Sequence, residues 1–151
     1  MIDINLTTPF LTTKEVLPVM RKNKFGRIIN ISSTHGLIAS ANKSAYTASK
    51  HGIVGLTKVT ALETAKENIT CNSVCPGFVL TELIQDQIDL IAKKKKISIQ
   101  KAEVELLKEK QPSLQFVQKN DIASLIYYLS SEGASQITGS NIPIDGAWTS
   151  Q

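Results

Sequence analysis

Apolar residues follow two kinds of pattern along the chain, and together they predict strands that alternate with helices. A near-continuous apolar run lies between Gly26 and Ile31, and a second lies between Ile69 and Cys75. Runs without regular polar alternation are typical of parallel strands covered on both faces. A third, shorter strand is expected at about 141–144, before Asp145 and Gly146.

Helical spacing of apolar residues appears on either side of these runs and predicts helices over 4–22 and 44–66. Residues 81–110 are more polar and are also expected to be rich in helix. A further helix is expected to be capped by Asp121 and to end near Gly133. Pro18 is expected to bend or shorten the last turn of the first helix. This order of elements predicts an α/β protein.

Length and composition indicate one domain over residues 1–151 with one core, because the chain is 42% hydrophobic and 20% charged. No long apolar run or signal-like segment is present, so we expect a soluble, cytoplasmic protein without a membrane partner. Cys71 and Cys75 would lie roughly 13 Å apart on one strand, too far for a disulfide. Both are expected to be reduced and buried.

The net charge of +4 equals the charge of one run, Lys93–Lys96. Nucleic-acid surfaces spread their basic residues over a face and add aromatic or base-reading side chains, so no nucleic-acid partner is expected. A solvated loop is the interpretation we favour for the run, and an anionic partner or membrane surface remains the alternative.

Candidate chemistry lies just after the first predicted strand, where Ser33 and His35 follow the apolar run. Ligands bind beyond the carboxyl ends of the strands in open α/β sheets. The next helix is expected to begin at about Ser44 as an N-cap, which places Tyr46 and Lys50 on one helical face. A fixed cation beside a phenol favours the phenolate, so Tyr46 becomes a candidate general acid or base, with Ser33 orienting a carbonyl or alcohol. On spacing alone, a solvated helical pair and a turn serine are the more usual interpretations.

The order of these motifs resembles the short-chain dehydrogenase/reductase family. The matching stretches cover most of the chain: N-I-S-S-T-H-G-L, K-S-A-Y-T-A-S-K-H-G-I-V-G-L-T-K, I-T-C-N-S-V-C-P-G-F-V-L-T and P-I-D-G-A-W. The resemblance implies the C-terminal half of a doubly wound, Rossmann-like parallel sheet. It is closest to family members that act on D-3-hydroxybutyrate, and it implies NAD-dependent interconversion of D-3-hydroxybutyrate and acetoacetate.

The resemblance also assigns roles to residues. It implies a catalytic group of Asn5, Ser33, Tyr46 and Lys50, and NAD contacts from Tyr46, Lys50, Pro76, Gly77, Val79 and Thr81. It implies that the carboxylate of a small hydroxy or keto acid is held by His35, Lys43, Gln87 and Trp148. Residues 81–110 would form a lid over the substrate, the two long helices would form a homo-oligomer interface, and no metal site is implied. Taken alone, Asn5 could be a cap, His35 a loop residue and Lys43 a surface residue.

The sequence has no G-x-G-x-x-G or T-G-x-x-x-G-x-G motif, so the glycine-rich strands that begin such a sheet are expected to be absent. We therefore expect the strand at Gly26 to expose a hydrogen-bonding edge. Loss of pyrophosphate contacts would weaken NAD binding by ~3 to 9 kcal/mol. Three readings remain open: a weak or inactive dehydrogenase portion, one subunit of a split enzyme with a separate N-terminal half, or a non-enzymatic self-associating protein.

Overall fold

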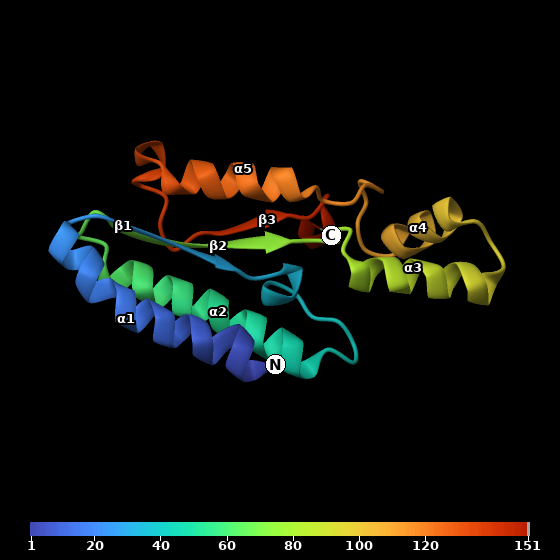
Figure 1. Cartoon of the computed structure of the whole chain (residues 1–151), viewed down its shortest axis with the longest axis horizontal. Helices are drawn as coiled ribbons and strands as arrows, with labels where there is room; N and C mark the ends of the chain where they lie inside the picture. Colours follow the sequence, from blue (N-terminus) through green and yellow to red (C-terminus); the bar gives the residue numbers. More distant parts are fainter. Residues whose placement is uncertain (151) are drawn as a thin grey trace.

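Three parallel strands form the centre of the computed structural model, which describes residues 1–150 (Figure 1). The strands are β1 (Gly26–Ile31), β2 (Ile69–Pro76) and β3 (Asn141–Ile144), in the order β1-β2-β3. Gly26 pairs with Ile69 at one end of the first ladder, and Pro76 pairs with Ile144 at the end of the second. The predicted α/β class and all three predicted strands are confirmed.

Helices cover both faces of this sheet (Figure 1). A π-helical turn (Asp3–Thr7) leads into α1 (Thr8–Asn23), which lies with α2 (Ser44–Glu63) on one face, whereas α5 (Lys119–Ser130) lies on the other. The core between β2 and α5 contains Val74, Leu129 and Ala134, all fully buried. Around it pack the partly buried residues Ile29, Ile122, Leu125, Ile126, Ile137, Ile142 and Ile144. The apolar faces of α5 and the sheet therefore bury each other.

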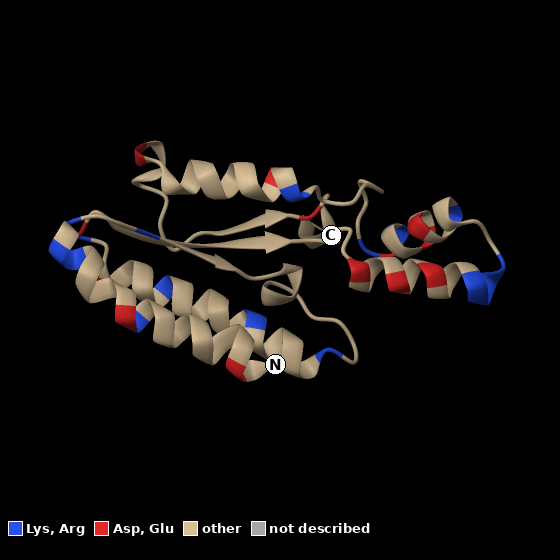
Figure 2. Ribbon diagram, viewed as in Figure 1, with Lys and Arg blue, Asp and Glu red and all other residues tan. Residues whose placement is uncertain are grey.

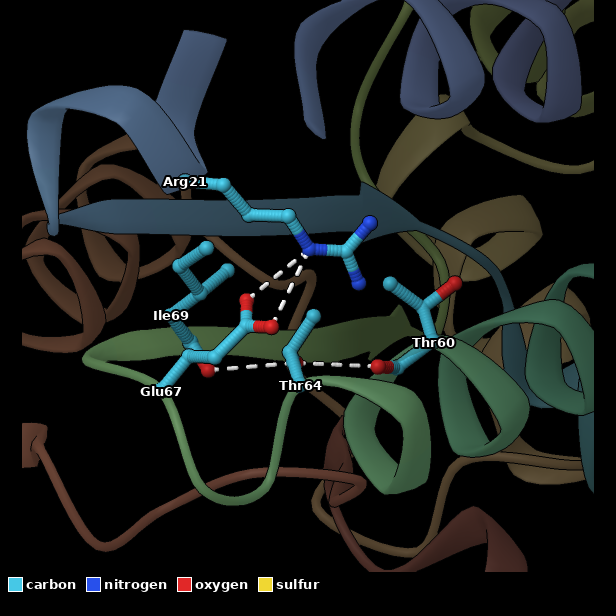
Figure 3. A network of polar contacts seen from close by, with 5 residues as sticks. All are labelled: Arg21, Thr60, Thr64, Glu67 and Ile69. Carbon is cyan, nitrogen blue, oxygen red and sulfur yellow. Dashed lines mark hydrogen bonds and ion pairs between the residues drawn. The ribbon is translucent and has the colours of Figure 1, made fainter. Parts of the chain in front are cut away.

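The junction between α2 and β2 is fixed by a buried threonine (Figure 3). The hydroxyl of Thr64 contacts the carbonyl oxygens of Thr60 at 2.9 Å and of Ile69 at 3.2 Å, so it links the helix end to the strand start. On the surface beside it, Arg21 of α1 donates to the Glu67 carboxylate at 3.1 Å. These contacts set where β2 begins relative to both helices.

Helices α3 (Glu82–Lys95) and α4 (Ile99–Lys108) form a hairpin beyond the carboxyl ends of the strands (Figure 1). Its own core consists of Ile88, Ala92 and Ala102, separate from the core under α5. Acidic residues lie along both helices and lysines gather at the turn between them (Figure 2). Three of the four lysines of the 93–96 run lie in the last turn of α3, so the prediction of a loop was wrong there, although all four are exposed.

Several predicted helix details need correction. Helix α1 runs through Pro18 to Asn23, so the proline does not shorten it. Ser44 is the first residue of α2 and not its cap; the cap position is held by Lys43, without a side-chain hydrogen bond. Helix α2 ends at Glu63 instead of near residue 66. Tertiary contacts, above all those of Thr64, decide these ends more than local propensity does.

The start and end of α5 also differ from expectation. Gln118 is the cap of α5, and Asp121 takes the third helical position, where its carboxylate accepts from the Gln118 backbone N–H at 3.2 Å. The helix ends at Ser130, and Gly133 lies in the short 3-10 turn that follows. The two side chains still satisfy amide groups at the helix start, as in a capping box.

Strand β1 lies at the edge of the sheet, as expected, with no strand on its other side within residues 1–150. It is less covered than predicted, because Ile31 is 45% exposed whereas every residue of β2 is buried. A groove of about 460 Å³ runs along this edge and is lined by β1, α1, Asn5 and Lys50. None of the described helices combines the length and apolar character needed to cross a bilayer.

Candidate active site

A cavity of about 750 Å³ opens where the carboxyl ends of the strands meet the α3–α4 hairpin. The loop after β1, the first turn of α2, the segment after β2, both hairpin helices and the C-terminal tail contribute to its walls. The sequence-predicted residues that line it are Ser33, His35, Lys43, Tyr46, Pro76, Gly77, Val79, Gln87 and Trp148. Ser33 and Trp148, which are 115 positions apart in the chain, are thus gathered in one place because parallel strands end at the same edge.

The loop after β1 holds Ser33 in a fixed position. Ser33 is extended and caps a 3-10 turn (Thr34–Gly36), where its hydroxyl accepts from the His35 backbone N–H at 3.2 Å. The hydroxyl of Ser32 donates to the Lys50 carbonyl at 3.1 Å and so ties the loop to α2. A Cβ at Gly36 would lie 2.3 Å from the Ser32 hydroxyl and 2.9 Å from the Lys50 carbonyl, so only glycine fits this close approach.

Tyr46 and Lys50 share one face of α2, as predicted. The Lys50 ammonium lies 5.7 Å from the centre of the Tyr46 ring and donates to the Ile31 carbonyl at 2.9 Å. Burial lowers the pKa of Lys50 below its ordinary value, because desolvation disfavours the charged ammonium. Lys50 lines the groove beside β1, whereas Tyr46 lines the larger cavity, so this one face of α2 contributes to both hollows.

Asn5 approaches this pair through one intermediate residue. Its amide nitrogen donates to the Ser49 hydroxyl at 3.3 Å, and that hydroxyl donates to the Tyr46 carbonyl at 2.7 Å. Asn5 lies in the π-helical turn before α1 and lines the β1 groove together with Lys50. The structure therefore places Asn5 on the wall of the β1 groove, hydrogen-bonded to α2, and not on the wall of the larger cavity.

Several aromatic rings line the larger cavity and contact one another. The His35 ring lies 5.7 Å from the rings of both Tyr46 and Trp148, edge to face, and Phe78 lies 4.8 Å from Trp148. His35 is buried, and its Nε2 atom has no hydrogen-bond partner within the described chain. Burial lowers the pKa of His35 first, and the charges of Lys110 and Lys43 lower it further. A neutral ring with an unpaired nitrogen can bond a polar ligand there.

The tail that carries Trp148 is fastened by a buried carboxylate. Asp145 accepts hydrogen bonds from the backbone N–H groups of Ala147 at 3.1 Å and Thr149 at 2.9 Å, and from the Thr149 hydroxyl at 2.6 Å. Gly146 adopts a left-handed φ of 58°, and a Cβ there would lie 2.1 Å from the Ser113 hydroxyl. This turn directs Trp148 into the cavity, where it is buried.

Only some of the residues predicted to contact the cofactor line the larger cavity. Pro76 at the end of β2, and Gly77 and Val79 just after it, line the cavity. Thr81 does not line it; its hydroxyl accepts from the Ile84 N–H at 3.4 Å and caps α3. Gln87 reaches the cavity from α3, and Lys43 reaches it from the loop before α2.

Two neighbouring residues at the end of α4 were missed from the sequence. Lys110 lines the cavity, and Gln111 is fully buried beside it. The Gln111 side chain accepts from the Phe78 N–H at 2.8 Å and donates to the Gln115 carbonyl. Nothing local marked either residue, because each acts through contacts with distant parts of the chain.

Comparison with known proteins assigns the class. A family model described as enoyl-(acyl carrier protein) reductase matches residues 1–149. With the strand-end cavity and the Ser33, Tyr46 and Lys50 arrangement, this match shows that the chain belongs to the short-chain dehydrogenase/reductase family. The chain is 54% identical over 150 residues to a D-beta-hydroxybutyrate dehydrogenase of Cupriavidus necator and 47% identical to one of Rhizobium meliloti. It covers 58% of the length of each, and 99% of this chain is matched.

Solved structures support the same fold. A 4-hydroxyisoleucine dehydrogenase complexed with NADH is 39% identical, with a TM-score of 0.86 over 99% of this chain and 58% of its own. Levodione reductase has the same TM-score at 31% identity and is covered over 56% of its length. The chain therefore spans a little under three fifths of the relatives it matches.

Proposed function

We propose that this chain is the catalytic portion of an NAD-dependent oxidoreductase that interconverts D-3-hydroxybutyrate and acetoacetate. The observation that carries the proposal is the meeting of Ser33, His35, Tyr46 and Trp148 in one cavity at the strand ends. The similarity to two D-beta-hydroxybutyrate dehydrogenases supports the substrate. A nicotinamide cofactor is supported by related structures that contain NADH or NADPH.

The residues present fit the nicotinamide end of such a cofactor. The Pro76–Val79 segment faces Tyr46 across a cavity of about 750 Å³, and the orphan Nε2 of the buried His35 offers a polar contact beside it. When bound, NAD would supply the acceptor for the hydride that leaves the carbinol carbon of the substrate. The pyrophosphate end has no glycine-rich turn in this sequence, so its contacts must come from residues other than these.

Each side chain has a defined role in the proposed reaction. Ser33 holds the reacting oxygen, and Tyr46 takes the hydroxyl proton during oxidation. Lys50 would hold the ribose hydroxyls of the cofactor, and Asn5 would support the proton path through Ser49. His35, Lys43 and Gln87 converge on the substrate carboxylate, and Trp148 closes the apolar side.

The exposed edge of β1 supports a two-part arrangement as the second candidate. The edge offers unpaired backbone groups beside a groove lined by Ile28, Ile29, Ile31 and Val16, which suits an apolar parallel strand with its helix. Such a strand, whether from the same protein or from a separate N-terminal half, would complete the cofactor site.

We also propose that the protein forms a homo-oligomer, and the exposed apolar side chains on α1 and α2 support this. Phe10, Val59 and Leu62 are 51%, 53% and 78% exposed, respectively. A second copy covering this face would bury them. The same face would serve a non-enzymatic, self-associating protein. Sedimentation should show a dimer or larger species that Leu62→Asp returns toward monomer, and a monomeric wild-type chain would exclude this interface.

The decisive experiment measures NADH binding through Trp148 fluorescence and then acetoacetate-dependent NADH oxidation. It is run on the chain alone and after mixing with the part of the Cupriavidus necator relative that the chain does not match. Turnover that appears in the mixture and falls by at least about 10²-fold in Tyr46→Phe would support the proposal. Equal turnover in Tyr46→Phe, or no NADH binding in either sample, would refute it.

A further inference from the structure

Lys110 occupies a position in the cavity that none of the predicted roles includes. It follows α4 and lines the same cavity as His35 and Trp148. Its ammonium donates to the Ser40 hydroxyl at 3.0 Å and lies 5.4 Å from the centre of the Trp148 ring. It thus links the end of the hairpin to the loop between β1 and α2, which lie 70 residues apart in sequence.

The backbone that carries Lys110 is held in place by its neighbour. Gln111 is completely buried, accepts from the Phe78 N–H at 2.8 Å and donates to the Gln115 carbonyl. A Cβ at Gly77 would lie 2.5 Å from the Gln111 side-chain oxygen, so this contact needs the glycine at the end of β2. Lys110 is therefore anchored to the segment after β2 and is not carried by the free part of the hairpin.

The charges around the cavity are mainly positive. Lys43 and Lys110 line it, and the one carboxylate among its described lining residues belongs to Glu109, which is exposed. Both lysines act on the buried His35, since their charges contribute to the lowered pKa of its ring. Two ammonium groups facing one neutral, unpaired ring nitrogen suit a ligand with a carboxylate.

We propose that Lys110 is a specificity-determining residue that selects substrates with a carboxylate, with Ser40 and the Trp148 ring positioning its ammonium. This inference rests on the proposed function, because it concerns the acid end of the same substrate. Lys110 supplies the charge from the hairpin side of the cavity, and Lys43 supplies it from the α2 side. An acid is then attracted from two sides, whereas a neutral ester of the same shape gains nothing from either charge.

The test compares acetoacetate with methyl acetoacetate, which lacks the negative charge, by titrating the chain and following Trp148 fluorescence. Dissociation constants come from the saturation midpoints, so a change in starting intensity does not affect them. We expect Lys110→Met to bind acetoacetate about tenfold more weakly, equivalent to about 1.4 kcal/mol, with ester binding unchanged. The matched control is Lys94→Met, an exposed lysine of α3 away from the cavity, which should match the wild type.

Further variants separate charge from structure. Lys110→Arg should keep the preference for acetoacetate over its ester, whereas Lys110→Gln, which is also long and polar, should lose it. If Lys110→Met does not fold, this pair of variants tests the role of the charge. Ser40→Ala keeps the charge but removes the hydroxyl that positions the ammonium, so the preference for acetoacetate should weaken, by less than in Lys110→Met. Equal weakening of acid and ester in Lys110→Met, or unchanged acid binding, would overturn the proposal.

The outcome for the wild type separates this inference from the proposed function. If the wild-type chain does not prefer acetoacetate over its ester, both the Lys110 role and the 3-hydroxybutyrate assignment are wrong. NADH binding in that case would still support a dehydrogenase with a different substrate. If the wild type prefers the acid and Lys110→Met does too, only the Lys110 role is refuted.

Discussion

Replacing Asp145 with alanine should loosen the tail that carries Trp148. The carboxylate accepts two backbone N–H groups and one hydroxyl, at 3.1, 2.9 and 2.6 Å. Hydrogen bonds to a charged acceptor contribute roughly 1.5–3 kcal/mol each. Water can reach part of this turn after truncation, so we expect a loss of about 2 to 4 kcal/mol of unfolding free energy, less than the full sum.

The assay is chemical denaturation followed by Trp148 fluorescence, because this is the only tryptophan and it is 5% exposed. In Asp145→Ala the native emission should shift to the red as the ring leaves the contacts with Phe78 and His35. Asp145→Asn keeps one acceptor oxygen and should lose less. Asp89→Ala removes an exposed carboxylate with a single side-chain partner and serves as the control. Native emission and a denaturation midpoint equal to the wild type in Asp145→Ala would refute the reasoning.

Three other predictions concern stability. Because the pKa of His35 is lowered in the folded chain, the unfolded chain binds more protons below about pH 6.5, and the free energy of unfolding should fall as the pH falls. The fall should be smaller in His35→Gln, and parallel stability–pH profiles of the two proteins would contradict this. Gly36→Ala should lower the unfolding free energy by about 1–3 kcal/mol through overpacking. Gly55→Ala, with open space at its Cβ, should raise the free energy of unfolding by about 1 kcal/mol. If Gly36→Ala and Gly55→Ala changed stability in the same direction, the close packing around Gly36 would not be the cause. Chemical denaturation should show that Thr64→Val lowers the free energy of unfolding by about 1–3 kcal/mol and that Arg21→Met lowers it by less than about 1 kcal/mol. The reverse order would show that the Arg21–Glu67 ion pair contributes more than the Thr64 hydroxyl.

The sequence predicted most of what is local. Strands were predicted at 26–31, 69–75 and about 141–144, and the structure has them at 26–31, 69–76 and 141–144. The shared face of Tyr46 and Lys50 was predicted from helical spacing. Helix ends were less accurate, because a hydroxyl such as that of Thr64 fixes them through a partner beyond the helix.

Long-range contacts explain what the sequence could not show. Lys110 owes its place to Gln111, whose partner Phe78 lies 33 residues earlier. Asn5 and Lys50 line the β1 groove and not the larger cavity because of how the turn before α1 and the helix α2 pack against β1, and no motif encodes that packing. The family resemblance supplied roles for these residues, and the structure supplied their arrangement.

The separate core of the α3–α4 hairpin has a consequence for how the protein opens. Ile88, Ala92 and Ala102 pack among themselves and not with the core under α5, and Phe116 of the segment after α4 packs against them. We therefore expect the hairpin to open together with that segment while its own side chains stay packed. We expect its amide protons to exchange together, with an opening free energy smaller than that of the sheet. The sheet and the α3–α4 hairpin would then open as separate units, and Gln111 lies at the boundary between them.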